Sequence, residues 1–154
     1  MVPSVLFVCL GNICRSPLAE AAFRREAEQR GLQVEVDSAG TGTWNLGKAP
    51  DARAQAVAVR EGIDVSHRRA RQVTANDFAR FTHIVALDAQ NLDDLAALRP
   101  ETSAAELSLL LDHVPGRAGE AVADPYYGED GGFEATWRDV EAGAAGLADR
   151  LQRR

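Results

Sequence analysis

The sequence predicts an α/β domain with three layers, in which helices cover both faces of a four-stranded parallel sheet. Short β-branched or apolar runs alternate along the chain with segments whose apolar residues recur every three or four positions. This alternation favours a parallel sheet with right-handed crossovers, because a helix must return the chain to the same edge before the next strand starts. With 154 residues, 45% of them hydrophobic, we expect one domain over residues 1–154 with a single core.

The first half of the chain holds two predicted strand–helix pairs. Residues 5–8 form a β-branched and aromatic run typical of a buried parallel strand. The next helix is expected over residues 17–30, with Ser16 as its N-cap and a proline at its first position. A strand that stops at Ser38 follows and, after a glycine-rich loop, a helix over residues 51–61. The alanine-rich face of the first helix should be buried, which leaves its charged residues in solvent: Glu20, Arg24, Arg25 and Glu28.

The second half of the chain continues the alternation. A capping signal at residues 74–77 predicts a short helix, and residues 82–87 form the third predicted strand. The helix after that strand must end before Pro100. Residues 107–111 are the best candidate for the fourth strand, although an apolar run of this length also fits a buried helix. The last helix shows apolar residues at alternating spacings of four and three: Phe133, Trp137, Val140, Ala144, Leu147 and Leu151.

Charge and composition argue against several classes of protein. The formal net charge of −6 does not suit a general nucleic-acid binder. No apolar run is long enough to span a bilayer, and the N-terminus lacks the features of a signal peptide, so no membrane insertion is expected. The two cysteines suggest a reducing compartment, hence a cytoplasmic protein, and are too few for a zinc site. The basic run at residues 67–71 is interpreted as a solvated turn in preference to a substrate-steering patch.

The segment from Cys9 to Pro17 joins the first predicted strand to the first predicted helix through a loop suited to an oxyanion. Gly11 permits a backbone conformation that other residues resist, so successive N–H groups can point inward at the helix N-terminus. Arg15 adds a two-pronged guanidinium for the oxygens of a phosphate. The same field favours the thiolate of Cys9, which places a nucleophile beneath the phosphorus. The Gly-Lys-Ser/Thr ending of a nucleotide-binding loop is absent from this segment.

Three segments, Cys9–Pro17, Asp37–Thr41 and Asp124–Gly128, together resemble the low-molecular-weight protein tyrosine phosphatases. The resemblance covers essentially the whole chain, in the expected order. It implies the flavodoxin-like strand order 2-1-3-4, and hydrolysis of phosphotyrosine in proteins through a phosphocysteine on Cys9, without a cofactor. The alternative is a buried Cys9 beside an incidental Arg15.

The resemblance also implies roles for individual residues. Arg15 and the loop amides would hold the phosphate, and Asp124 would be the general acid and then the base, although alone it fits an ordinary loop carboxylate. Ser16 would hydrogen-bond the thiolate and Asn12 would link the loop to Ser38, although these also fit plain cap and turn residues. His67 is a further candidate for this support, in a run one residue longer than in some relatives. The residues assigned to phosphate binding and loop support are Leu10, Gly11, Asn12, Ile13, Cys14, Ser16 and Ser38.

Aromatic residues are expected at the rim of the site. Trp44, Tyr126 and Tyr127 are similar to the residues with which the family flanks a phenyl ring, the alternative for Trp44 being an inward-packed side chain. Cys14 is either a small buried packing residue or the partner of Cys9 in a reversible disulfide that would protect the nucleophile.

Three rival functions are weighed against phosphotyrosine hydrolysis. Arsenate reductases on this scaffold relay electrons through further downstream cysteines, and this chain has none after Cys14. In protein arginine phosphatases a threonine resembles the position of Ile13, whereas an isoleucine and two rim tyrosines favour a phenyl leaving group. A non-catalytic phosphotyrosine-binding module would not need Cys9, Arg15 and Asp124 together.

The resemblance, especially to bacterial members, also suggests a partner. The expected substrate is a tyrosine-phosphorylated protein, for example an autophosphorylating tyrosine kinase that governs polysaccharide export. We expect the phosphatase itself to be a monomer.

Overall fold

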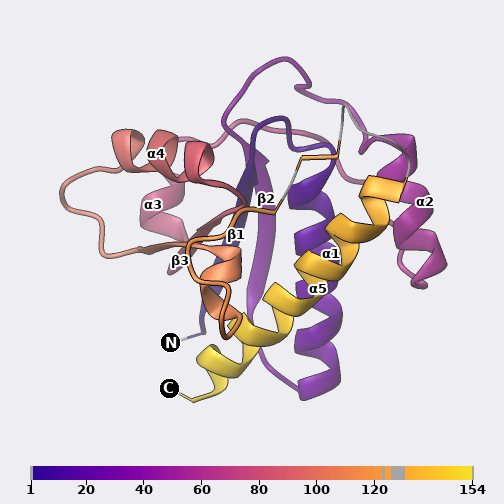
Figure 1. The fold of residues 1–154 in the computed structure, drawn as a ribbon. Coiled ribbons are helices and arrows are strands. Elements are labelled where there is room, and N and C mark those ends of the chain that lie inside the picture. The colour runs from indigo at the N-terminus through magenta and orange to yellow at the C-terminus, as the bar shows by residue number, and fades with distance from the viewer. Residues whose placement is uncertain (1, 123, 126–130, 154) are drawn as a thin grey trace.

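The computed structural model describes residues 2–122, 124–125 and 131–153. Its centre is a parallel sheet with the strand order β2-β1-β3-β4, which confirms the predicted topology (Figure 1). The strands are β1 (Ser4–Cys9), β2 (Glu35–Gly40), β3 (His83–Ala86) and β4 (Glu106–Leu109). Every residue of β1 is buried, as expected for a central strand covered on both faces.

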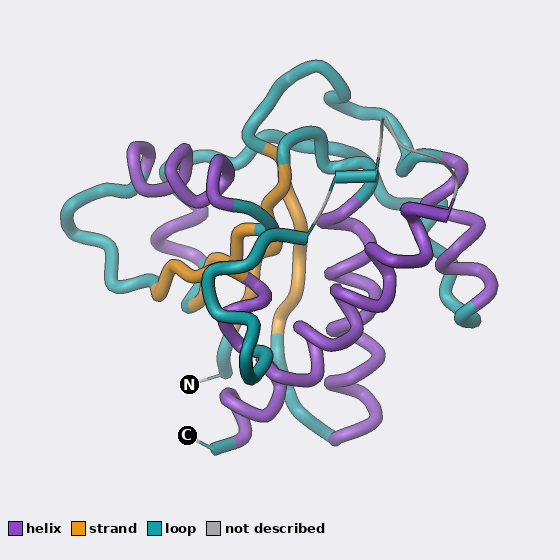
Figure 2. Tube along the Cα trace, in the orientation of Figure 1, coloured by secondary structure: helices purple, strands orange, loops and turns teal. Residues whose placement is uncertain are grey.

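Helices cover the two faces of this sheet as predicted, and Figures 1 and 2 show the three layers. Alternate residues of β1 point to opposite faces. Val5 and Phe7 pack in one hydrophobic cluster, whereas Leu6 and Val8 pack in another. The first cluster lies beneath α1 (Arg15–Arg30), α2 (Ala52–Arg60) and α5 (Gly131–Gln152), and the second beneath α3 (Asp77–Arg80) and α4 (Ala89–Leu98).

The fourth strand is shorter than the apolar run 107–111 predicts. β4 ends at Leu109, and the chain continues as a 3₁₀ turn, η1 (Leu110–His113). The side chain of Asp112 stabilises this turn, because its carboxylate accepts the main-chain N–H of Leu109 at 3.0 Å. Leu110 is fully buried within the turn. The apolar run therefore predicts that these residues are buried, but it does not distinguish a strand from a buried turn.

The start of α1 also differs from the prediction. The helix begins at Arg15, and Cys14 occupies the N-cap position without a side-chain cap hydrogen bond. Ser16 consequently lies within the first turn and is not the N-cap. Its hydroxyl group contacts the side chains of Cys9 and Asn12 instead. The hydroxyl that would have capped the helix therefore takes part in side-chain hydrogen bonds within the loop.

Gly146 of α5 lies where the helix passes directly over η1. A Cβ atom at this position would stand 2.0 Å from the main-chain oxygen of His113. We therefore expect Gly146→Ala to lower the free energy of unfolding by about 1–3 kcal/mol, because the clash outweighs the better helix propensity of alanine. Urea unfolding measures this difference. Gly132→Ala is the matched control, since a Cβ there would meet Pro125 at an ordinary 3.5 Å; equal stability of the two variants would contradict the prediction.

Candidate active site

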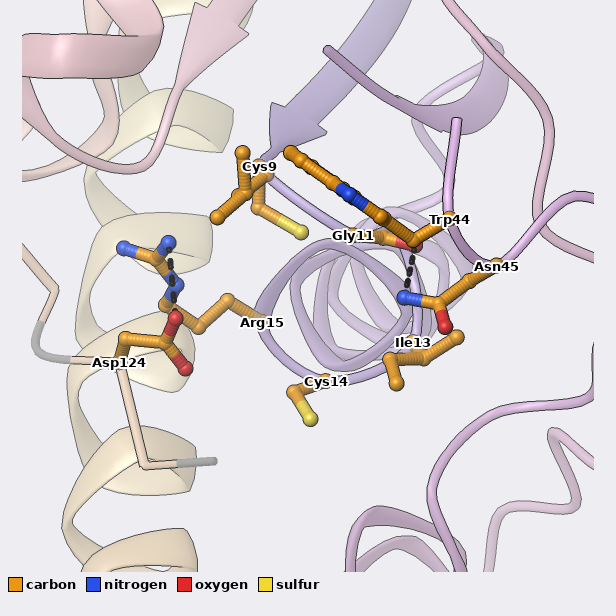
Figure 3. A pocket seen from close by; sticks show the side chains of 9 residues that line it. Cys9, Gly11, Ile13, Cys14, Arg15, Trp44, Asn45 and Asp124 are labelled. Carbon is orange, nitrogen blue, oxygen red and sulfur yellow. Dashed lines mark hydrogen bonds and ion pairs between the residues drawn. The ribbon is translucent and has the colours of Figure 1, made fainter. Parts of the chain in front are cut away.

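A cavity of about 330 Å³ lies at the carboxyl end of β1 (Figure 3). Open α/β sheets bind ligands at this edge. The cavity lies above the loop that leaves β1 and is bordered by two loops from distant parts of the chain. Its lining residues are Cys9, Leu10, Gly11, Ile13, Cys14, Arg15, Trp44, Asn45 and Asp124.

Cys9 lies at the base of the loop, at the end of β1, with 3% of its surface exposed. Its Sγ atom accepts the main-chain N–H of Asn12 at 3.3 Å and lies 3.0 Å from the hydroxyl oxygen of Ser16. The main-chain N–H of Asn12 stabilises negative charge on sulfur, the Ser16 hydroxyl does so when it is the donor, and the N-terminus of α1 adds the positive end of its dipole. Within the described part of the chain, the main-chain N–H groups of residues 13–15 donate no hydrogen bond, which leaves them available to an anion.

The backbone of the loop takes its left-handed conformation at Asn12, with φ of 56°, and not at Gly11. At Gly11 a Cβ atom would stand 2.7 Å from the side-chain amide nitrogen of Asn45, so a larger residue there would displace the end of that side chain. Asparagine tolerates the left-handed region better than most residues. Here the side chain of Asn12 is fixed by hydrogen bonds from its amide nitrogen to two serines and to its oxygen from the main-chain N–H of Arg71. The amide nitrogen of Asn12 donates to Ser16 at 2.8 Å and to Ser38 at 3.1 Å, so the predicted link between loop and β2 is present.

Arg15 presents its guanidinium to the cavity although only 2% of the residue is exposed. The side chain is fixed by Asp88, whose carboxylate accepts Nη1–H at 2.7 Å, and by the main-chain oxygen of Val122 at 2.9 Å. Its Nη2 atom lies 3.6 Å from the carboxylate of Asp124 (Figure 3). In the sequence Asp88 is marked only by its place directly after the third predicted strand.

The two carboxylates beside Arg15 differ in their exposure and in their place relative to the cavity. Both oxygens of Asp88 are engaged, one by Arg15 and the other by the main-chain N–H of Asn91 at 2.7 Å, where Asp88 caps α4. Asp124 lines the cavity and has 37% of its side chain exposed. Of these two groups, Asp124 is therefore the one placed to exchange a proton with a bound molecule.

Trp44 stands at the rim of the cavity and is 69% exposed, so the inward-packed alternative is excluded. Asn45, which no sequence motif marks, lines the cavity beside it and donates to the main-chain oxygen of Gly11 at 3.4 Å (Figure 3). Tyr126 and Tyr127 lie outside the described residues.

Cys14 is a free, buried thiol on the wall of the same cavity. Burial raises the pKa of this thiol, and the nearby carboxylate of Asp51 acts in the same direction. Cys14 therefore remains protonated near neutral pH, which makes it a slow nucleophile. Its disulfide with Cys9 stays a prediction.

The basic run at residues 67–71 is only partly the solvated turn that the sequence predicts. His67 and Arg69 are exposed, but Arg68 pairs with Glu20 at 2.6 Å, and Arg71 pairs with two aspartates at 3.1 Å. Glu20 is buried, which contradicts its predicted solvent-facing position. The helical pattern of α1 misplaces it because two partners of this carboxylate, Arg68 and Ser38, come from other segments of the chain and only Arg24 belongs to the helix.

No metal site is formed by the described residues, among which no three His, Cys, Asp or Glu side chains gather as ligands. The cavity is lined by the thiols of Cys9 and Cys14, the guanidinium of Arg15 and the carboxyl group of Asp124.

Comparisons with known proteins agree with this geometry. Residues 4–154 match the family model of the low molecular weight phosphotyrosine protein phosphatases. The chain is 47% identical over 152 residues to a low molecular weight protein-tyrosine-phosphatase of Streptomyces coelicolor, covering 96% of this chain and 92% of that protein. The fold matches the crystal structure of YfkJ from Bacillus subtilis with a TM-score of 0.92 and 40% identity, covering 99% and 96% of the two chains. It also matches a Drosophila arginine phosphatase with a TM-score of 0.89 and 34% identity, covering 96% and 97%.

Proposed function

Because the chain belongs to the low molecular weight phosphotyrosine protein phosphatase family, a family of phosphoric monoester hydrolases, we propose that it hydrolyses phosphotyrosine in proteins through a phosphocysteine on Cys9. The observation that carries the proposal is the convergence of three groups on one cavity. Cys9 lies at its base, while Arg15 and Asp124 border it with Nη2 and a carboxylate oxygen 3.6 Å apart.

In the first step, the thiolate of Cys9 attacks phosphorus, the S–P bond forms, and the bond from phosphorus to the tyrosine oxygen breaks. Arg15 and the N–H groups of residues 13–15 hold the remaining phosphate oxygens, where charge changes most. The carboxyl group of Asp124 gives its proton to the leaving phenolate.

In the second step, water attacks the phosphorus of the phosphocysteine. The carboxylate of Asp124 takes the proton of this water, the S–P bond breaks, and inorganic phosphate leaves. The released thiolate is stabilised again by the hydroxyl of Ser16 and the main-chain N–H of Asn12. No step in this sequence needs a metal or a redox partner.

Asp88 serves this reaction by holding the guanidinium of Arg15 in place. We expect Asp88→Asn to lower kcat/KM on a phosphotyrosine peptide by about 10²-fold, because a small misplacement of a positioning group weakens every phosphate contact. Asparagine remains a good N-cap for α4, so the unfolding midpoint should change little. Steady-state kinetics with a parallel thermal melt measures both quantities, and an unchanged kcat/KM in the folded variant contradicts this role.

Trp44 supplies a flat, exposed surface for the phenyl ring of the substrate. We expect Trp44→Ala to lower kcat/KM on phosphotyrosine peptides about tenfold while inhibition by inorganic phosphate stays unchanged, because stacking is worth about 0.5–1.5 kcal/mol. Leu46→Ala is the matched control, since Leu46 is exposed on the same loop but does not line the cavity. If Trp44→Ala weakened inhibition by inorganic phosphate as much as it lowered kcat/KM on the peptides, the result would contradict a stacking role for Trp44.

A second candidate function is the hydrolysis of phosphoarginine. It is favoured by the structural likeness to the Drosophila arginine phosphatase. Against it, the cavity is bordered by the apolar side chain of Ile13 and the indole of Trp44, which suit a phenyl ring better than a guanidinium group.

The test of the proposed function is the initial rate, in the presence of a chelator, on matched phosphotyrosine, phosphoserine and phosphoarginine peptides, with Cys9→Ser as the blank. The proposal expects phosphotyrosine to be the best substrate and the blank to be inactive. Faster hydrolysis of phosphoarginine would favour the second candidate, and binding without turnover of any peptide would indicate a phosphotyrosine-binding module.

The remaining proposals concern the setting of the reaction. We propose that the protein acts as a monomer in the cytoplasm on a tyrosine-phosphorylated protein, with an autophosphorylating tyrosine kinase as a candidate. The free thiols of Cys9 and Cys14 fit a reducing compartment. No helix among the described residues is long and apolar enough to cross a membrane.

A further inference from the structure

The orientation of the Trp44 indole is not fixed by burial in the core, because 69% of this residue is exposed at the rim of the cavity. An exposed side chain ordinarily exchanges between rotamers within nanoseconds. A ligand that contacts such a side chain must also immobilise it, and this lowers the affinity. The contacts that hold the ring in one orientation therefore affect how well Trp44 recognises an aryl group.

The main chain on both sides of Trp44 is tied to the loop that leaves β1. Before it, the main-chain N–H of Gly42 donates to the main-chain oxygen of Leu10 at 2.9 Å. After it, the side chain of Asn45 donates to the main-chain oxygen of Gly11 at 3.4 Å. With the main chain held in this way, the position of the indole depends on the two side-chain torsion angles of Trp44.

Gly42 leaves empty the space that the indole occupies. A Cβ atom at Gly42 would stand 1.9 Å from Cζ3, 2.3 Å from Cε3 and 3.0 Å from Cη2 of Trp44. These three atoms belong to the six-membered ring, which therefore fills the volume that a side chain of residue 42 would need. Gly42 is not among the glycines with a positive φ, unlike Gly47 at 78°. The lack of a side chain at Gly42 thus permits the close approach of the ring, and no backbone conformation requires it.

The ring held against Gly42 also borders the cavity. Trp44 lines the cavity, whereas Gly42 does not. Figure 3 shows the indole edge-on, with one face turned toward the side on which Cys9 and Arg15 lie. A phosphate group held above Cys9 by Arg15 therefore has the indole beside the group that it carries.

We propose that Gly42 is a positioning residue for substrate recognition: by leaving room for the six-membered ring of Trp44, it holds the indole in the orientation that contacts an aryl phosphate. This inference deepens the proposed function and rests on it, since the substrate is an aryl phosphate ester. A ring that is already oriented loses less side-chain freedom when the ligand binds. Gly42 thereby contributes to the preference for phosphotyrosine over phosphoserine, which has no ring to contact the indole.

Two phosphonates test this role without a reaction. Phenylphosphonate carries an aromatic ring and methylphosphonate does not, and neither contains a phosphate ester bond that could be hydrolysed. Calorimetric titration gives a dissociation constant for each ligand. The ratio of the two constants reports the contact with the aromatic ring, and the constant for methylphosphonate reports the state of the loop that holds the phosphate.

Gly42→Ala adds a single methyl group where the ring now lies. Two non-bonded carbon atoms are best separated by about 3.5 Å or more, so the ring must leave its position. We expect phenylphosphonate to bind about fivefold more weakly while the affinity for methylphosphonate stays unchanged. The thermal unfolding midpoint should change little, because the displaced ring is exposed. An unchanged preference for phenylphosphonate, or equal losses for the two ligands, overturns the proposal.

A double variant shows whether Gly42 acts through Trp44. In a Trp44→Ala background, Gly42→Ala should have no further effect on either phosphonate, because no ring remains to be displaced. Thr43→Ala is the matched control, since it changes the exposed side chain between these two residues and Thr43 does not line the cavity. A further loss in the Trp44→Ala background, or the same loss for Thr43→Ala, would overturn the proposal.

Circular dichroism in the near ultraviolet follows the indole directly. The chain contains two tryptophans, and the spectrum of the wild type minus that of Trp44→Ala isolates the contribution of Trp44, because Trp137 is present in both. A ring in fixed packing gives such a signal and a freely rotating ring loses it. The same difference taken in the Gly42→Ala background should be clearly weaker or changed in shape. An identical difference spectrum would show that the ring has not moved, against the proposal.

The two proposals fail in different ways. If the wild-type protein hydrolyses none of the phosphopeptides but Gly42→Ala lowers the preference for phenylphosphonate through Trp44, the proposed function is wrong and the positioning role of Gly42 stands. If the peptides are hydrolysed but the preference does not respond to Gly42→Ala, the positioning role is wrong and the proposed function stands.

Discussion

Cys9→Ser is expected to lower kcat on a phosphotyrosine peptide by about 10⁴-fold or more, because a serine hydroxyl is not ionised near neutral pH and burial raises the pKa of Cys14, the other thiol at the cavity. Binding should survive this change. Arg15 and the loop N–H groups that hold the phosphate do not depend on the sulfur, and Arg15 is fixed independently by Asp88 at 2.7 Å. Calorimetric titration of the variant with the peptide should therefore give a dissociation constant close to the KM of the wild type.

Rapid acid quenching tests the same prediction on the intermediate. The wild-type enzyme should carry phosphate on Cys9 during turnover, and Cys9→Ser should carry none. Substantial turnover by Cys9→Ser, or phosphate found on a residue other than Cys9 in the wild type, would contradict the phosphocysteine mechanism.

Asp124→Asn is expected to lower kcat by about 10²–10⁴-fold on a phosphotyrosine peptide, the range for loss of a general acid. The loss should shrink for aryl phosphates whose phenols are more acidic, because a good leaving group needs no proton. A series of substituted phenyl phosphates measures this dependence.

Asp88→Asn is the matched control for Asp124→Asn, since both carboxylates lie beside the guanidinium of Arg15. Asp88 has both oxygens engaged, so its loss should lower the rate by a similar factor across the whole series. If the two variants depend on the leaving group in the same way, Asp124 is not the acid.

The parts of the structure predicted correctly are those set by neighbours in sequence. The strands and helices follow from apolar periodicity. The loop at residues 9–17 is recognisable because a strand, a glycine, an arginine and a helix start follow one another in the sequence. Two of the errors arise where the sequence pattern is equally compatible with two local structures. Ser16 fits a helix cap, but its hydroxyl contacts Cys9, and the run 107–111 divides between β4 and η1.

The sequence by itself determined the layered fold, the family and the residues of the loop that cradles an anion, because each depends on residue types at short spacings. Tertiary structure alone decided how Arg15 is held by Asp88 and how Glu20 is paired with Arg68. These pairs join residues that are far apart in the chain, and one partner of each pair, Arg15 or Glu20, is buried. Only the packed fold brings such groups close enough for the pairing to offset the cost of removing them from water.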